Sequence, residues 1–273
     1  VAETVTVTGA APAIDTMRAG TSANIPAEVK EVLPSISRGL LDVIRVNPYF
    51  NALTENNTVT APSVAGRNNR YNSIQIDGAI NNDLFGLSAS GTPGGQTDTQ
   101  PVSFDAIEQI QLVVSPYDVR QGGFSGGGIN AITKSGSNQF SGTAFYFGRN
   151  QDWVGKGIAN TELATFKDQQ WGGTFGGRLV ANRAFFFGSV DWGRRETPTG
   201  FCITGCAQEF RSSAANVDRF FSILENKYGY SVADARDEFS RTTNSDKFLG
   251  KVDVNLSNQH RLTLRHNYVN GLN

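Results

Sequence analysis

Apolar and polar residues alternate along four long segments in the second half of the chain. Most alternate positions there are apolar, aromatic or glycine, and the positions between include polar or charged side chains such as Lys251, Asp253 and Arg265. Alternation with a period of two predicts β-strands with one apolar and one polar face. The segments are residues 171–179, 184–192, 248–256 and 262–268. Segments of about ten residues match tilted strands that span a bilayer, with lipid on one side and a polar lumen on the other.

The connections between these strands alternate in length. Residues 182–183 and 257–259 predict tight turns, whereas residues 153–170 and 197–245 predict long loops. Short periplasmic turns and long extracellular loops are typical of outer-membrane barrels, and a soluble sandwich does not predict this rhythm. A further aromatic strand from residue 140 brings the number of strands to about five. Because open strand edges are excluded from hydrocarbon, the remainder of a closed barrel of about 22 strands is expected outside this chain.

The longer of the two loops contains the pattern of an amphipathic helix. Residues 216–228 place four apolar side chains on one side of such a helix: Val217, Phe220, Phe221 and Leu224. Apolar helical stripes usually face a core, so packing on the base of the loop itself is favoured over contact with a ligand.

The first half of the chain predicts small helices and short strands. Residues 25–33 and 37–44 have the length and apolar spacing of two short helices bounded by proline. Ile74 and Ile76 alternate into an Asp-Gly dipeptide, which is a strong turn signal. Residues 104–114 predict a turn of helix that leads into a strand. By themselves, these elements indicate a small α+β domain.

A glycine-rich junction connects the two halves. Glycines at positions 122, 123 and 126–128 precede the β-prone run INAITK, a Ser-Gly-Ser-Asn turn and the aromatic strand. The stretch GINAITKS differs by one residue from the phosphate-binding P-loop, because Thr133 stands where that motif requires glycine. A P-loop also opens a helix, and the residues after Lys134 stop one. Tight packing and turns therefore explain these glycines better than nucleotide binding does.

The order of these motifs resembles the junction between plug and barrel in TonB-dependent outer-membrane transporters. The run GGGINAITKSGSNQFSGTAF is similar to the Oar-like branch of that family, and a Gly-Arg pair followed by NSIQIDG is similar to its plug signature. The resemblance implies an α+β plug domain followed by antiparallel transmembrane β-barrel strands that form an incomplete barrel. It identifies as plug-motif residues Gly66, Arg67, Asp77, Gly78, Gly127, Gly128, Asn130, Thr133 and Lys134. Considered alone, Asp77 before glycine indicates turn chemistry rather than a catalytic acid.

The first residues of the chain alternate β-branched side chains. In the same family this segment is similar to the TonB box, the peptide that pairs with the energising partner TonB by adding a strand to its sheet. Its residues are Glu3, Thr4, Val5, Thr6, Val7, Thr8 and Gly9. A first plug strand or a linker explains so short an alternation equally well, so both interpretations stay open.

Composition and charge exclude several other classes of protein. The 273 residues carry a formal charge of −1, so no basic field indicates nucleic acid. The 30 Gly and 18 Phe, against one Met, favour β-structure and turns. No run approaches the roughly 20 apolar residues of a membrane helix. The first half has neither His nor Cys, so it offers no nucleophilic triad; we expect no enzyme activity, no cofactor and no metal site.

Two cysteines, Cys202 and Cys206, lie in the longer loop. A zinc site needs further ligands, and His260 and His266 belong to a different strand pattern. A redox motif prefers two residues between the cysteines rather than three. An even pair in a loop of an exported chain predicts a disulfide formed in an oxidising compartment.

These features together predict three regions. Residues 1–10 are a possible TonB box, residues 11–138 a plug, and residues 139–273 the first strands of a barrel. Because the chain starts without a basic leader and stops just past a strand, we expect both ends to be cut.

The expected function is energised, gated passage of an unidentified substrate through a plugged barrel of the bacterial outer membrane. The expected partners are TonB, the lipid bilayer and the remainder of the barrel, with no nucleic acid. The alternative is an Oar-like barrel for adhesion or secretion that takes up no nutrient. An extracellular carbohydrate-acting enzyme is disfavoured, because the sequence shows no convincing catalytic group.

Overall fold

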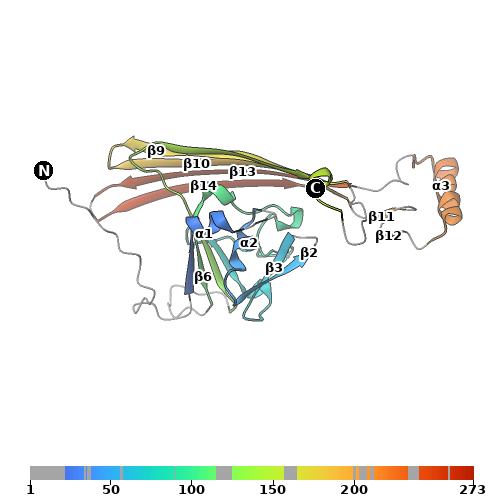
Figure 1. Ribbon diagram of the computed structural model, residues 1–273, viewed down its shortest axis with the longest axis horizontal. Coiled ribbons are helices and arrows are strands. Elements are labelled where there is room, and N and C mark those ends of the chain that lie inside the picture. The colour runs from blue at the N-terminus through green and yellow to red at the C-terminus, as the bar shows by residue number, and fades with distance from the viewer. Residues whose placement is uncertain are drawn as a thin grey trace. The chain divides into compact units, whose positions relative to one another are not determined.

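The chain divides into two compact units. The computed structural model describes residues 22–273 except 34, 36–37, 56–57, 89, 115–124, 157–164, 199–200, 203–207, 210–211, 233–239 and 258 (Figure 1). The N-terminal unit comprises Val1–Thr92 and Glu108–Thr133, and the strand unit comprises Pro93–Ile107 and Lys134–Asn273. Pro93–Ile107 thus groups with the long strands although it lies within the range predicted for the plug.

The N-terminal unit is built on a five-stranded sheet with the strand order β1-β6-β7-β4-β5. Its strands are β1 (Ser22–Pro26), β4 (Ser73–Ile76), β5 (Ala79–Ile80), β6 (Ile107–Val113) and β7 (Gly128–Thr133). β1 pairs antiparallel with β6, and β4 runs parallel to β7. The sheet contributes apolar side chains to the core: Ile25, Ile74, Ile76, Ile110, Leu112 and Ile129 are all buried.

Two short helices and a hairpin complete this unit. α1 spans Ala27–Val32 and α2 spans Leu40–Ile44, both inside the predicted helical ranges. Ile25, predicted as the first helical residue, belongs to β1 instead, because a residue before proline prefers extended backbone. β2 (Phe50–Glu55) pairs antiparallel with β3 (Thr58–Val64).

The strand unit contains five long antiparallel strands in the order β14-β13-β10-β9-β8 (Figure 1). They are β8 (Ser141–Asn150), β9 (Lys167–Val180), β10 (Ala184–Pro198), β13 (Ser240–Asn255) and β14 (Arg261–Leu272). All five predicted strands are therefore present. The tight turns predicted between β9 and β10 and between β13 and β14 are present as well.

These strands are longer than predicted, and the two long loops are correspondingly shorter. β9, β10 and β13 have 14, 15 and 16 residues, and they extend into both predicted loop ranges. The added residues are polar: Arg195 lies opposite Asp168, and Arg194 lies opposite Asn244. The apolar alternation ends before the hydrogen-bonded ladder does, so a count of apolar positions underestimates the lengths of these strands.

Short elements occupy the connections. Four are single 3₁₀ turns: η1 (Asn69–Tyr71), η2 (Gly95–Thr97), η3 (Phe104–Ala106) and η4 (Gln151–Trp153). β11 (Phe201–Cys202) and β12 (Gln208–Glu209) form a parallel pair.

α3 (Ala214–Tyr228) includes the helix predicted in the longer loop, and Gly229 ends it in the left-handed conformation. The sequence predicted that the apolar side of this helix packs on the base of its own loop, and this prediction is only partly correct. Val217 is buried, but Phe220 is exposed. None of the described helices combines the length and the apolar character that crossing a membrane requires.

Candidate functional site

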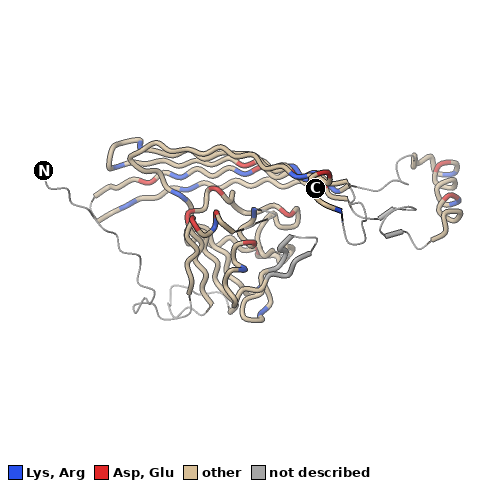
Figure 2. Tube along the Cα trace, viewed as in Figure 1, with Lys and Arg blue, Asp and Glu red and all other residues tan. Residues whose placement is uncertain are grey.

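The long sheet has an exposed apolar face and a buried polar face. On the apolar face, Phe175, Leu264 and Tyr268 are 55%, 72% and 53% exposed. On the polar face, Asp191 and Asp253 are 0% and 2% exposed. An antiparallel sheet in a water-soluble protein instead buries its apolar face in the core and exposes its polar face to water. Charged positions also recur along the lengths of these strands and not only at their ends (Figure 2).

The strand register keeps each face continuous across the sheet. Phe186 lies opposite Val252, which in turn lies opposite Leu264. The adjoining pairs place Phe187, Lys251 and Arg265 together on the other face. A one-residue slip would exchange the two faces of a strand, so this register confirms that the predicted apolar positions share one face.

Aromatic side chains gather toward both ends of the apolar face. Trp171 lies directly opposite Trp192 at one level. Phe140, Phe175 and Phe186 form a cluster at the other, with ring centroids 5.6–6.4 Å apart. Two aromatic levels with an apolar band between them are the arrangement of an outer-membrane wall.

The polar face carries paired charges. The ammonium Nζ of Lys247 lies 3.3 Å from Oδ1 of Asp191, and Gln170 Nε2 donates to both oxygens of that carboxylate at 3.1 and 2.9 Å. Farther along the sheet, Asp253 accepts from Thr263 Oγ1 at 2.6 Å and lies 2.9 Å from Arg261. Buried charges are tolerated because each carboxylate has a cation and a hydrogen-bond donor beside it.

In the N-terminal unit, two predicted plug-motif residues meet across the parallel pair β4–β7. The Asp77 carboxylate accepts from the backbone N–H of Thr133 at 2.7 Å and from its hydroxyl at 2.6 Å. Asp77 and Gly78 also form the two-residue turn between β4 and β5, with φ of 47° and 81°. The turn interpretation of Asp77 is thus correct but incomplete, since the same side chain clamps two segments that lie 56 positions apart.

The other residues of the glycine-rich junction support this clamp. Asn130 Oδ1 accepts from the N–H of Gly78 at 2.9 Å. Gly127 has no room for a side chain, because a Cβ would lie 2.5 Å from Cγ1 of Val64. Its neighbour Gly128 lies opposite Ser73 in the parallel pair.

The remaining motif residues lie apart from the clamp. Gly66 has a φ of 76° in the turn after β3, and the N–H of Arg67 donates there to Val64 O at 2.9 Å. The N–H of Lys134 donates to Ala106 O at 2.8 Å in the strand unit. The structure gives these three residues turn and connection roles.

Asn72 was missing from the predicted site residues. Its buried amide donates to Pro62 O at 2.7 Å and accepts from Gly127 N–H at 3.1 Å, so it joins β3 to the glycine-rich junction. It is the first residue of the NSIQIDG run, directly before β4, and this position was the only sequence feature that could have marked it as a site residue. Nothing in the sequence indicated the partner 55 positions away.

The loop after β5 is tightly built. Asp83 accepts from the backbone N–H groups of Ser88 at 2.6 Å and Phe85 at 3.1 Å. The hydrogen bond from the Ser88 N–H is the largest of the effects that act on this carboxyl, and it lowers the pKa of Asp83 below its usual value of 3.8. Arg70 donates to Gly86 O at 3.1 Å across the same loop.

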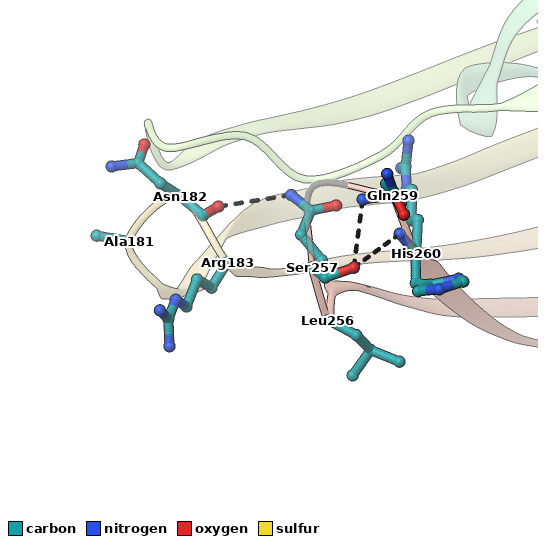
Figure 3. A pocket seen from close by; sticks show the side chains of 9 residues that line it. Ala181, Asn182, Arg183, Leu256, Ser257, Gln259 and His260 are labelled. Carbon is teal, nitrogen blue, oxygen red and sulfur yellow. Dashed lines mark hydrogen bonds between the residues drawn. The ribbon is translucent and has the colours of Figure 1, made fainter.

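A hollow of about 680 Å³ lies beside the two tight turns of the strand unit (Figure 3). Arg183, His260 and Arg261 line it together with polar groups, and its lining contains no carboxylate. Ser257 Oγ accepts from the N–H groups of Gln259 and His260, which fixes one of the turns. The cationic side chains in its lining make the hollow basic.

Some predicted sites lie outside the described residues. These are the TonB-box candidate at residues 3–9, together with Cys206. For Cys202, the structure describes only its place in β11, so the disulfide stays a prediction. Within the described part of the chain, no three His, Cys, Asp or Glu side chains gather as metal ligands would.

Comparison with known proteins first finds a similarity in the strand unit. Residues 132–213 match the family model of an outer membrane beta barrel domain. The reversed faces of the sheet agree with this match, and the chain is located in the outer membrane.

A curated relative and two solved structures are also similar to this chain. The chain is 24% identical to the TonB-dependent transporter Oar of Myxococcus xanthus over 97% of its own length and 25% of the relative. It superposes on the outer membrane transporter YddB of Escherichia coli with a TM-score of 0.61 at 15% identity, covering 92% of this chain and 33% of that one. The siderophore receptor PirA of Pseudomonas aeruginosa gives 0.57 at 14%, covering 93% and 34%. The resemblance to Oar-like TonB-dependent transporters is thus confirmed.

The chain spans about a quarter of the length of the curated relative it matches and about a third of these solved structures. At such low identity, the two solved structures bear on the fold alone.

Proposed function

We propose that the N-terminal unit is the plug, and the strand unit the first part of the wall, of an energised outer-membrane transporter. The observation that carries this proposal is the reversed sheet, which buries charge and exposes apolar side chains, directly after a compact α+β unit. Residues 134–140 connect β7 to β8. A plug followed at once by its wall has this chain order.

In the proposed mechanism, substrate binds on the outer side, and the TonB box at residues 3–9 is offered on the inner side. TonB then pairs with that peptide and transmits force from the inner membrane, which rearranges the plug and opens a path. The Asp77–Thr133 clamp supports this role, because it fixes β4 against β7 at the strand that leads into the wall. The proposed boundaries are residues 1–10 for the box, 11–138 for the plug and 139–273 for the first strands.

The test for energised coupling uses the TonB-box candidate in the full-length protein. Val5→Pro removes a backbone N–H that strand addition needs, so pull-down with the periplasmic domain of TonB and TonB-dependent uptake should both be lost. Val5→Thr keeps that donor and should behave as the parent does. Barrel assembly, followed by heat-modifiable migration on a gel, should be the same in all three proteins.

Two outcomes would change the proposal. If Val5→Pro binds TonB as well as the parent, residues 3–9 are a linker. If a deletion strain grows normally on all tested nutrients but loses surface attachment, the adhesion or secretion role replaces uptake.

A further inference from the structure

The basic hollow of the strand unit is formed by two neighbouring turns. The turn between β9 and β10 contributes Arg183, and the turn between β13 and β14 contributes His260, with Arg261 at the start of β14. Because β10 pairs with β13, the two turns lie next to each other at the same end of the sheet (Figure 3). The volume of about 680 Å³ falls within the range of small-molecule pockets.

Backbone hydrogen bonds define the shape of this hollow. The N–H of Arg183 donates to Val180 O at 3.1 Å, and the N–H of Leu256 donates to His260 O at 2.9 Å. The two turns are also joined to each other, since the N–H of Asn255 donates to Arg183 O at 2.7 Å. A hollow that is already formed loses little conformational entropy when a ligand binds, which favours affinity.

The cationic groups of the hollow still have donors available for a ligand. The side chains of Arg183 and His260 have no hydrogen-bond or ion-pair partner among the described residues. Arg261 lies 2.9 Å from Asp253 Oδ1, but its side chain is 58% exposed. A guanidinium has five N–H donors, so Arg261 can hold this carboxylate and also donate to a second anion. The hollow is therefore suited to an anionic ligand.

The number of cationic donors indicates which anion fits. Guanidinium groups bind phosphate oxygens through paired N–H donors, and these charge-assisted bonds are stronger than neutral ones. Arg183 and Arg261 come from two different turns. Two guanidinium groups at separate points of one hollow suit an anion with several acceptor oxygens, as a phosphate group has.

The hollow adjoins the apolar face of the sheet. Leu256 lines the hollow and is 65% exposed, and Leu262 on β14 lies opposite Val254 on the apolar face. Figure 3 shows the side chains of Arg183 and Leu256 extending to the same side of the two turns. Cationic groups directly beyond a lipid-facing apolar surface lie at the level of the lipid headgroups, and basic pockets there bind anionic headgroups.

We infer that the hollow binds a phosphate group, with Arg183 and Arg261 donating to its oxygens. The neighbouring apolar face favours the phosphate of a phospholipid, whose acyl chains contact Leu256 and the residues beside it. A water-soluble phosphate compound offers the same anionic oxygens without the chains, so the experiment distinguishes the two sources. This site goes beyond the proposed transport function and does not depend on TonB.

The first measurement is lipid binding by the full-length protein in detergent, followed by native mass spectrometry. The probes are dioleoylphosphatidylglycerol and dioleoylglycerol, which has the same acyl chains but no phosphate. We expect the parent protein to bind the phospholipid at least about tenfold more tightly, because charge-assisted hydrogen bonds to the phosphate are lost in the second probe. This comparison uses the parent protein alone, so it does not depend on the assembly of any variant.

The second measurement places the phosphate in the hollow. Arg183→Gln removes a guanidinium from an exposed turn, and it should weaken phosphatidylglycerol binding about tenfold. Arg219→Gln removes the same charge from an exposed position of α3, outside the hollow, and it should bind the lipid as the parent does. Heat-modifiable migration checks that both variants have assembled.

Calorimetry with inorganic phosphate distinguishes the two sources of the phosphate. If Arg183→Gln weakens the binding of phosphatidylglycerol, the site takes a phospholipid headgroup. If the parent does not distinguish the two lipids, but binds inorganic phosphate and loses that binding on Arg183→Gln, the site takes a soluble phosphate compound.

Three results would overturn the inference. One is a parent protein that neither prefers phosphatidylglycerol to dioleoylglycerol nor binds inorganic phosphate. Another is equal binding of both phosphate probes by the parent and by Arg183→Gln. The third is equal weakening by Arg183→Gln and Arg219→Gln, which would mean that the net charge of the protein, rather than the hollow, attracts the anion.

Discussion

The sheet of the N-terminal unit and the sheet of the strand unit each have five strands, yet they bury opposite kinds of residue. In the first, Ile110 and Leu112 on β6 are fully buried. In the second, Lys247 and Lys251 on β13 are buried, while Phe248 between them is exposed. Both sheets follow the same two-residue period, so the difference lies in what each face meets.

The comparison shows that burial has a different meaning in the two sheets. In the N-terminal unit, burial removes apolar area from water and stabilises the fold. In the strand unit, the buried face consists of ion pairs and hydrogen bonds, and the apolar face is left for lipid. The four predictions that follow test this contrast, and they run from the largest expected effect to the smallest.

Breaking the buried ion pair should have the largest effect. Lys247→Met leaves the Asp191 carboxylate buried beside Gln170 without its cation, and should cost about 3–5 kcal/mol of stability. The double variant Lys247→Met, Asp191→Asn should recover much of that loss, because no unpaired charge remains. Denaturant titration of the full-length protein in lipid vesicles measures both. If the double variant were no more stable than the single one, the pair would not be the reason for the loss.

An arginine on the apolar face should have the next largest effect. Leu264→Arg should impair assembly by about 2–4 kcal/mol if the position lies near the bilayer midplane. The adjacent change Thr263→Arg places the same guanidinium on the polar face, beside the Asp253 carboxylate, and should be milder. Folding yield into vesicles compares the two. Equal yields would show that β14 does not face lipid.

In the N-terminal unit, loss of the clamp hydroxyl should have a smaller and more local effect. Thr133→Val removes the O–H that donates to Asp77, and should cost about 1.5–3 kcal/mol. Thr133→Ser keeps the hydroxyl and is the matched control. Hydrogen exchange of the β7 amides should accelerate only in the valine variant. Unchanged exchange would mean that the parallel pair does not depend on this bond.

The smallest expected effect is a change of loop order with pH. Since the pKa of Asp83 is lower in the folded loop than its ordinary value of 3.8, its stabilising contribution is present above that ordinary value. The contribution is lost as the pH falls through the lower folded value. Protection of the Ser88 and Phe85 amides should therefore fall in acid below pH 3.8. Asp83→Asn should show weaker protection at neutral pH and little further loss on acidification.

Much of the fold follows from local sequence. The alternation in residues 248–256 predicted both the strand and its faces, and the Asp-Gly pair predicted the turn between β4 and β5. The strand ends were missed, because residues such as Asp168 and Arg195 extend the ladder through polar pairing that hydropathy does not detect. The exposure of Phe220 was missed because an apolar helical stripe does not say whether a core exists nearby.

The candidate site was predictable as a set of residues but not as an arrangement. The family signature identified Asp77, Thr133 and Asn130. That Asp77 accepts from Thr133, and that Asn72 reaches Gly127, depends on β4 and β7 lying side by side. The same holds for Lys247 and Asp191, which the register of β10 against β13 brings together.

The sequence by itself determined where strands form, which positions share a face and where the chain turns. These features depend on the backbone period and on the φ preferences of glycine, aspartate and proline, and both act within a few residues. Only the tertiary structure decided which charges pair and which hydroxyl completes the clamp. Each of these depends on distances between segments far apart in the chain, and strand order and register set those distances.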